Sequence, residues 1–338
     1  MTCACGRRHV LLGSLAAAFA PGARAAAKPH RIDVHHHVVP PIWVEAVKKA
    51  KLDNPPMTNW TPEQSLADMD KAGTATAMLS PMPPHVGFLP AAEAARVARG
   101  ANEWTRQLAT DHPGRFGLFA MLPMPNIDES LKEIAYAFDV LKADGVGLMT
   151  NYGDKWLGYA EFAPVFEELN RRKAVVYTHP MSPSCCVNLV RGLSDGFVDW
   201  GADTTRTIGN LIFSGAAAKY ADIDFIFSHG GGVLTAVAER FRIQAVTTPP
   251  YKGKFDRDMV DKQLKRFYYD TAQVSNEVTI EALAKLVGVS RIVFGTDYPY
   301  RTGAEHVSGL TARFGHRDLM AIDRANALRI LPAWRSGA

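Results

Sequence analysis

Side chains of the types that bind divalent metals recur where short apolar runs of this sequence end. His35 and His37 are separated by one residue, so on a β-strand their imidazoles face the same side while His36 faces elsewhere. Three further candidates, each at the end of a separate run, are His179, His229 and Asp297. Imidazoles combined with a carboxylate suit zinc, and manganese, iron and cobalt accept similar ligands. The pattern therefore predicts one shared site for a divalent metal ion.

The runs that carry these residues predict eight short, buried β-strands. Most are rich in valine, isoleucine, phenylalanine or tyrosine, as the buried strands of a parallel sheet are. We expect strands at residues 32–36, 75–80, 116–121, 145–149, 174–179, 224–229, 267–270 and 292–297. Between them, amphipathic patterns predict helices at residues 90–111, 128–142, 164–173, 204–220, 233–245, 277–286 and 318–331.

This alternation predicts the α/β class and a (β/α)8 TIM-like barrel formed by one domain, residues 28–338. Eight units fit a closed barrel better than an open doubly wound sheet, which is the alternative. Active sites of such barrels lie at the carboxyl ends of the strands, so the candidate ligands meet at one mouth. The long connection at residues 180–203 leaves this end and is expected to form a lid or pocket wall.

The composition is that of a soluble globular protein, with 47% apolar and 21% charged residues. The formal net charge of +4 includes three arginines within residues 1–27, a segment that has no acidic residue. Without those three, 35 basic side chains oppose 34 acidic ones. A nearly neutral body gives no electrostatic reason to expect nucleic acid or an anionic membrane as a partner.

The N-terminal segment has the pattern of an export signal. Arg7 and Arg8 precede a modest apolar run at residues 10–20, and a small-residue cleavage site follows at residues 23–25. Twin arginines are typical of one export route, so we expect residues 1–27 to be removed and the protein to be periplasmic or secreted. An ordinary secretory signal and an uncleaved anchor are the alternatives. The run is shorter than the ~20 residues that span a bilayer, so the mature chain is expected to have no membrane segment.

The motifs around the candidate ligands resemble the decarboxylase branch of the amidohydrolase superfamily. That branch includes 6-methylsalicylate, γ-resorcylate and aminocarboxymuconate-semialdehyde decarboxylases, and the resemblance covers about residues 32–332. Its motifs are Asp33-x-His35-x-His37, His179-Pro180, His229-Gly230-Gly231-Gly232 and Gly295-Thr296-Asp297-Tyr298-Pro299. The resemblance implies a barrel of the metal-dependent hydrolase type.

The resemblance also implies roles for individual positions. His229 matches a histidine near the metal that acts in proton transfer, and Tyr300 matches an aromatic pocket position. Arg240 matches an arginine that binds the substrate carboxylate, in some relatives from the neighbouring subunit, which implies a homodimer. The family's metal ligands match His35, His37, His179 and Asp297.

Two departures from the family pattern narrow these expectations. Binuclear amidohydrolases have a carboxylated lysine at the end of the fourth strand, and residues 145–150 contain no lysine. One divalent metal is therefore expected, with zinc favoured and manganese as the alternative. The semialdehyde decarboxylase has an arginine shortly before the segment that begins here at Trp60, and residues 52–59 contain none. An aromatic monocarboxylate therefore suits the site better than that dicarboxylate.

The favoured function is that of a metal-dependent carboxy-lyase, which removes the carboxyl group of a small aromatic or enoic acid without oxidation. Asp297 or His229 would deliver the proton, and the sequence does not choose between them. The first alternative is a hydrolase of a lactone, ester or amide, in which Asp297 accepts a proton from metal-bound water. The second alternative is an exported protein that binds a metal or ligand without catalysis.

The remaining histidines and the cysteines are given structural roles, with one exception. His85 follows the second strand and is a further candidate for the pocket wall. Cys185 and Cys186 are adjacent, so no disulfide framework is expected. We expect a surface or helix-end position for His30, His112, His306 and His316.

Overall fold

Eight parallel strands form the centre of the molecule, in the order β1-β2-β3-β4-β7-β8-β9-β10. The computed structural model describes residues 1, 2 and 29–335, so the expected export signal lies almost wholly outside the described residues. The strands are β1 Arg31–His37, β2 Thr74–Ser80, β3 Phe116–Met121, β4 Gly145–Met149, β7 Val175–His179, β8 Asp224–Phe227, β9 Tyr268–Asp270 and β10 Ile292–Val293. All eight expected strands are present.

Backbone hydrogen bonds between β1 and the segment after β10 close the ring of strands. The Val34 N–H donates to the Phe294 carbonyl at 2.9 Å, and the Asp297 N–H donates to the His35 carbonyl at 2.8 Å. The expected (β/α)8 barrel is confirmed, and the open doubly wound sheet is excluded. This closure also brings His35 and Asp297 together, although their positions in the chain differ by 262.

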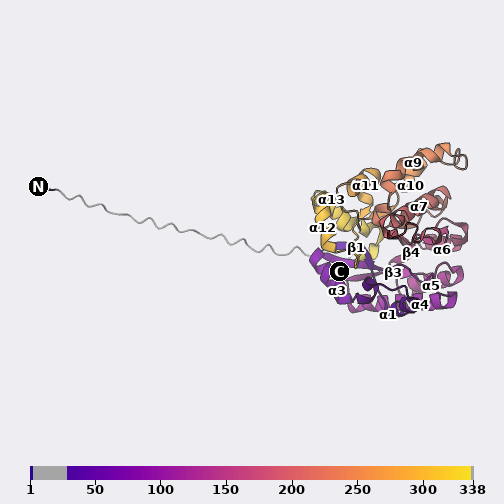
Figure 1. Cartoon of the computed structure of the whole chain (residues 1–338), viewed down its shortest axis with the longest axis horizontal. Coiled ribbons are helices and arrows are strands. Elements are labelled where there is room, and N and C mark those ends of the chain that lie inside the picture. The colour runs from indigo at the N-terminus through magenta and orange to yellow at the C-terminus, as the bar shows by residue number, and fades with distance from the viewer. Residues whose placement is uncertain (3–28, 336–338) are drawn as a thin grey trace.

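Helices surround the strands (Figure 1). Elements from the first part of the chain, such as α1, α3, α4 and α5, lie on one side of the strands, and α9, α10 and α11 lie on the opposite side. The helices are α1 Pro41–Lys49, α2 Pro55–Asn59, α3 Pro62–Ala72, α4 Ala91–Asp111, α5 Ile127–Asp139, α6 Ala163–Arg171, α7 Asp199–Phe213, α8 Ala216–Lys219, α9 Leu234–Thr247, α10 Arg257–Leu264, α11 Thr279–Val287, α12 Gly303–Thr311, α13 His316–Met320 and α14 Ala327–Ile330. A small hairpin adds β5 Asn151–Tyr152 and β6 Lys155–Trp156.

The barrel interior beneath the strand ends is a packed core. Phe119 and Tyr177 stack with their ring centroids 5.7 Å apart, and both belong to a buried cluster with Met78 and Ile226. The same cluster includes Ile330 of α14. The polar side chains at the carboxyl ends of the strands therefore lie directly above a packed interior, as in other closed barrels of this kind.

Several expected elements differ from the observed ones at their ends. The expected helix at residues 204–220 begins earlier, at Asp199, and breaks at Gly215, which has φ 83°. The expected strands that carry His229 and Asp297 stop before these residues, at Phe227 and Val293. No helix within the described residues is long and apolar enough to cross a membrane.

Candidate active site

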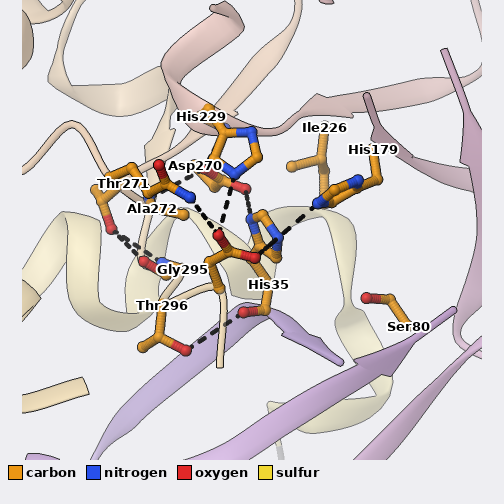
Figure 2. Close-up of polar contacts among 12 residues, drawn as sticks. His35, Ser80, His179, Ile226, His229, Asp270, Thr271, Ala272, Gly295 and Thr296 are labelled. Atoms are coloured by element: carbon orange, nitrogen blue, oxygen red, sulfur yellow. Dashed lines mark hydrogen bonds and ion pairs between the residues drawn. The ribbon is translucent and has the colours of Figure 1, made fainter. Parts of the chain in front are cut away.

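Three imidazoles converge on one oxygen of Asp297 at the carboxyl end of the barrel. The Nε2 atoms of His35 and His37 each lie 3.1 Å from Asp297 Oδ1, and these nitrogens are 3.3 Å apart. The Nε2 atom of His179 lies 3.9 Å from the same oxygen. Figure 2 shows His35 and His179 directed toward a common centre, with His229 beside them. The convergence gathers three imidazole nitrogens and one carboxylate oxygen, all atoms of the types that bind metals, around one point.

His229 approaches the same carboxylate from its other side. Its Nε2 atom lies 3.4 Å from Asp297 Oδ2, whereas the three other imidazoles approach Oδ1. By distance alone, one ligand atom each from His35, His179, His229 and Asp297 lies within 4.8 Å of the others, so His229 also qualifies as a ligand. His37 lies with His35 and His179 on the Oδ1 side of this carboxylate, whereas His229 lies on the Oδ2 side.

Hydrogen bonds on the outer ring nitrogens orient two of these imidazoles. His179 Nδ1 donates to the Pro180 carbonyl at 2.9 Å, and a carbonyl only accepts, so Nε2 carries the lone pair that faces the centre. His35 Nδ1 donates to Asp270 Oδ2 at 2.7 Å. The other oxygen of Asp270 accepts the backbone N–H groups of His229 at 2.8 Å and Ala272 at 3.1 Å. Such outer partners fix the tautomer and orientation of metal-binding histidines.

The electrostatics of the cluster favour a cation at its centre. Burial lowers the pKa of His35, but the carboxylates of Asp270 and Asp297 outweigh burial and raise it to about 10. Burial opposes ionisation of Asp297, yet its histidine neighbours, His35 first, hold its pKa well below the ordinary range. Burial lowers the pKa of His37 and His179, which favours neutral imidazoles with free lone pairs. The site therefore fits a divalent metal ion, which would take the place of the extra proton on His35.

Unusual backbone conformations place three of the polar side chains around the site. Asp297, Gln273 and His229 have φ values of 65°, 58° and 53°, in the left-handed region that non-glycine residues seldom adopt. Gly232, at φ 69°, completes the sharp turn after His229. A Cβ atom there would lie 2.0 Å from the Gly201 carbonyl oxygen, so only glycine fits. Strain of this kind clusters at functional sites.

Comparison with known proteins identifies the family. The model of the amidohydrolase family matches residues 32–332. The chain belongs to the amidohydrolase superfamily. It is 34% identical over 331 residues to the decarboxylase YanB of Aspergillus niger, covering 91% of this chain and 89% of that protein. It is 35% identical over 279 residues to the 6-methylsalicylic acid decarboxylase AcuB of Aspergillus aculeatus, covering 80% and 84%.

A solved structure gives the same architecture. The dihydroxybenzoic acid decarboxylase of Polaromonas sp. JS666, crystallised with manganese and the inhibitor 2-nitroresorcinol, superposes with a TM-score of 0.80. The two chains are 20% identical, and the match covers 90% of this chain and 98% of that one. Together with the sequence relatives, these findings place this amidohydrolase in the decarboxylase branch, as a metal-dependent decarboxylase. The hydrolase and the non-catalytic binder gain no support from them.

A cavity of about 730 Å³ opens beside His229 in this amidohydrolase. Its walls include Phe197, Val198 and Trp200, so the long connection after β7 forms a pocket wall as expected. The Trp200 ring lies 5.8 Å from the His179 ring, and its Nε1 donates to Ser182 Oγ at 3.1 Å. The other lining residues are Ser194, Gly196, Gly201, His229, Gly232, Val233, Gln273, Val274 and Arg301. Apolar walls with a few polar groups are typical of sites for small organic ligands.

The two residues expected to bind substrate occupy different positions. Tyr300 lies beside the metal site, with its ring centroid 6.1 Å from that of His37. Arg240 is exposed on α9 and does not line the cavity of its own chain. The described part of the chain therefore places Tyr300 near the site but leaves Arg240 outside it.

Two further histidines are fully buried. The expectation of a surface or helix-end position for His306 is wrong, because it lies on the inner face of α12 and is 1% exposed. Its Nδ1 donates to the Thr302 carbonyl at 2.9 Å, and its Nε2 accepts the Gln273 N–H at 3.0 Å. His85 is 0% exposed and is not among the residues that line the cavity beside His229.

Two residues of the site are absent from the sequence-based predictions. Asp270 ends the seventh strand, so it carries the same signal of a polar strand end that marks the histidines. Gln273 donates from Nε2 to Asp297 Oδ2 and lines the cavity. No motif marks Gln273, because its position depends on the left-handed turn that follows β9.

Proposed function

We propose that this enzyme removes the carboxyl group of a small hydroxylated aromatic acid without oxidation, with one divalent metal in its site. The convergence of His35, His37 and His179 on Asp297 Oδ1, with His229 at Oδ2 beside an apolar cavity, carries this proposal. The named substrate of the AcuB relative, 6-methylsalicylic acid, supports a hydroxylated aromatic acid.

We propose zinc as the metal, held by His35, His37, His179 and Asp297. Three imidazole nitrogens and one carboxylate oxygen suit zinc, and manganese in the Polaromonas neighbour supports the alternative. When bound, the metal supplies positive charge that orients the acid and stabilises negative charge as the carboxyl group leaves. Elemental analysis of the purified protein, alone and after incubation with each ion, distinguishes the two metals.

His229 is the proton donor in this proposal. Its side chain is 11% exposed and lines the cavity, whereas that of Asp297 is 4% exposed and is enclosed by its histidine neighbours. The bond between the ring carbon and the carboxylate breaks and carbon dioxide departs. The same ring carbon receives the His229 proton, which solvent then restores. A positioned general acid contributes ~10²–10⁴ in rate.

We further propose that a second copy of the chain covers the loop after β7. This loop exposes a run of apolar side chains, which is unusual for a monomer surface. They are Val187 at 54%, Leu189 at 62%, Val190 at 54%, Phe197 at 77% and Val198 at 57% exposure. A homodimer would bury them and would allow Arg240 of the partner subunit to reach the acid. Sedimentation that shows a fully active monomer would remove both parts of this proposal.

Export is proposed on sequence alone, from Arg7, Arg8 and the apolar run that follows them. Replacing both arginines by lysine should keep the protein in the cytoplasm of a host that has a twin-arginine pathway. Cell fractionation of the parent and the variant tests this, and equal amounts in the periplasm would contradict it.

The decisive experiment follows carbon dioxide release from a panel of hydroxylated benzoates by metal-loaded protein that lacks residues 1–27. His229→Ala should lose the activity while it keeps the metal, because His229 lies outside the proposed ligand set. Turnover of lactones or esters, with no carbon dioxide from any acid, would instead support a hydrolase. The metal site would survive that outcome, but the role of Arg240 would not.

A further inference from the structure

Arg301 brings a positive charge to the cavity from the same chain. It follows Asp297 by four residues, and its backbone N–H donates to the Asp297 carbonyl at 3.2 Å. The turn that places Asp297 at the metal site therefore also fixes the start of the Arg301 side chain. Arg301 lines the cavity together with His229 and Gln273.

The described residues that form the cavity walls include no negatively charged side chain to offset this arginine. Among the described residues that line the cavity, Arg301 is the one with a permanent charge, and none is aspartate or glutamate. Apolar side chains such as Phe197 and Val233 stand on the same walls. A flat apolar molecule with one negative charge matches this combination of an apolar wall and one guanidinium.

Glu305, which does not line the cavity, holds the guanidinium of Arg301. Two guanidinium nitrogens of Arg301, Nε and Nη2, donate to the carboxylate of Glu305, which lies one turn further along the chain. Both side chains are about half exposed, at 48% and 46%. Exposed ion pairs of this kind contribute little stability, so a second carboxylate competes easily for the same guanidinium.

The proposed reaction changes the charge of the ligand, so Arg301 can bind substrate and product with different affinities. The substrate is a carboxylate, whereas the products are carbon dioxide and a neutral phenol. A guanidinium at the cavity binds the acid more tightly than the phenol. It therefore favours entry of substrate over return of product.

We propose that Arg301 captures the carboxylate of the incoming aromatic acid, exchanging Glu305 for the substrate. This role rests on the proposed function and adds a specificity residue to it. It differs from the role proposed for Arg240, because Arg301 acts from the same chain and needs no partner subunit. Arg301 acts on binding and not on the bond-breaking step.

Two substitutions test the proposal in the full, zinc-loaded chain. One removes a positive charge and the other removes a negative charge. Arg301→Gln should raise KM for an accepted hydroxybenzoate about tenfold, with kcat within about twofold, because a charge-assisted hydrogen bond is lost in binding alone. Glu305→Gln should lower KM, because it frees the guanidinium. Inhibition by the phenol product should be the same in both variants. The control is Arg313→Gln, since Arg313 pairs with Glu277 and does not line the cavity.

Calorimetric titration with salicylate and with phenol separates this proposal from the proposed function. Salicylate should bind the parent about tenfold more tightly than Arg301→Gln, whether or not any acid is decarboxylated. If acids are decarboxylated and both variants keep the parent KM, the capture role is wrong and the function stands. If no acid reacts but salicylate affinity falls as expected, the proposed function is wrong, and what stands is that Arg301 binds the carboxylate of an aromatic acid. Equal salicylate affinity in parent and variant, or none in the parent, overturns the capture role.

Discussion

Asp270 Oδ2 accepts a hydrogen bond of 2.7 Å from His35 Nδ1, and neither side chain is exposed to solvent. Because the same carboxylate accepts the backbone N–H of His229, one residue of β9 orients both a proposed ligand and the proposed acid. His35 thus has a fixed tautomer, with Nε2 facing the three other proposed ligands. The site is held in shape by contacts between β1, β9 and the turn after β8.

The first prediction concerns the hydrogen bond by which Asp270 orients His35. Asp270→Asn keeps the shape of the side chain but replaces one acceptor oxygen by a donor, so His35 loses its fixed orientation. We expect zinc affinity to fall about 10- to 100-fold, as for other outer partners of metal-binding histidines. Competition with a chromogenic chelator measures the change. Asp256→Asn is the matched control, because Asp256 caps α10 and asparagine caps a helix equally well. Unchanged affinity in Asp270→Asn would contradict the role of Asp270.

A second prediction concerns Gln273, whose amide Nε2 donates to Asp297 Oδ2. Gln273→Met has a similar length but no donor, so the Asp297 carboxylate is held on one side by His229 alone. We expect kcat to fall by about tenfold while the metal content stays at the parent level. Gln273→Glu should lower kcat further, because two carboxylates would then face each other. A Gln273→Glu variant as active as the parent would show that this contact has no role in the site.

The sequence predicts the strands well because they are buried on both faces and therefore continuously apolar. The runs at β3 and β4 coincide with the expected bounds. Short helices, such as the eight-residue α10, are not predicted by the sequence. Such short helices are stabilised mainly by the burial of one face on tertiary packing, and not by a local sequence pattern.

The sequence predicts which histidines and which aspartate form the site, but it does not predict the backbone that positions all of them. His37 and His179 end their strands, so alternation and barrel geometry place them directly. His229 and Asp297 lie beyond their strands, in left-handed turns that no period in the sequence encodes. The contact between His306 of α12 and Gln273 depends on the left-handed turn after β9, which is why the sequence predicts a surface or helix-end position for His306.

A third prediction concerns the turn after His229. Gly232→Ala should cost about 3 kcal/mol or more, because an alanine Cβ would meet the Gly201 carbonyl at 2.0 Å and would also strain a positive φ. Gly253→Ala isolates the strain, since Gly253 has φ 82° and an alanine Cβ there would meet nothing within 4 Å. We expect about 1 kcal/mol for this control. Urea unfolding measures both, and equal losses would show that the close approach to Gly201 has no cost.

The last prediction is a pH dependence that arises from His85. Burial lowers the pKa of His85 from its ordinary 6.5 to about 4 in the folded chain. Its two ring nitrogens have no hydrogen-bond partner among the described residues. Above pH 6.5 the imidazole is neutral in both states and contributes no pH dependence. As the pH falls from 6.5 toward 4, the unfolded chain binds a proton that the folded chain does not, so stability is lost in this window.

The loss should amount to about 2 kcal/mol between pH 7 and pH 4.5, from a shift of roughly 2.5 pKa units. His85→Asn removes the titrating group and tolerates the φ of 64° at this position, so its unfolding free energy should decline by that much less. Metal-free protein is used for both, because acid also releases metal. His316→Asn is the control, since His316 is exposed and its replacement should leave the parent's decline intact. If His85→Asn and the parent lose stability equally over this range, His85 is not the residue that makes the fold sensitive to acid.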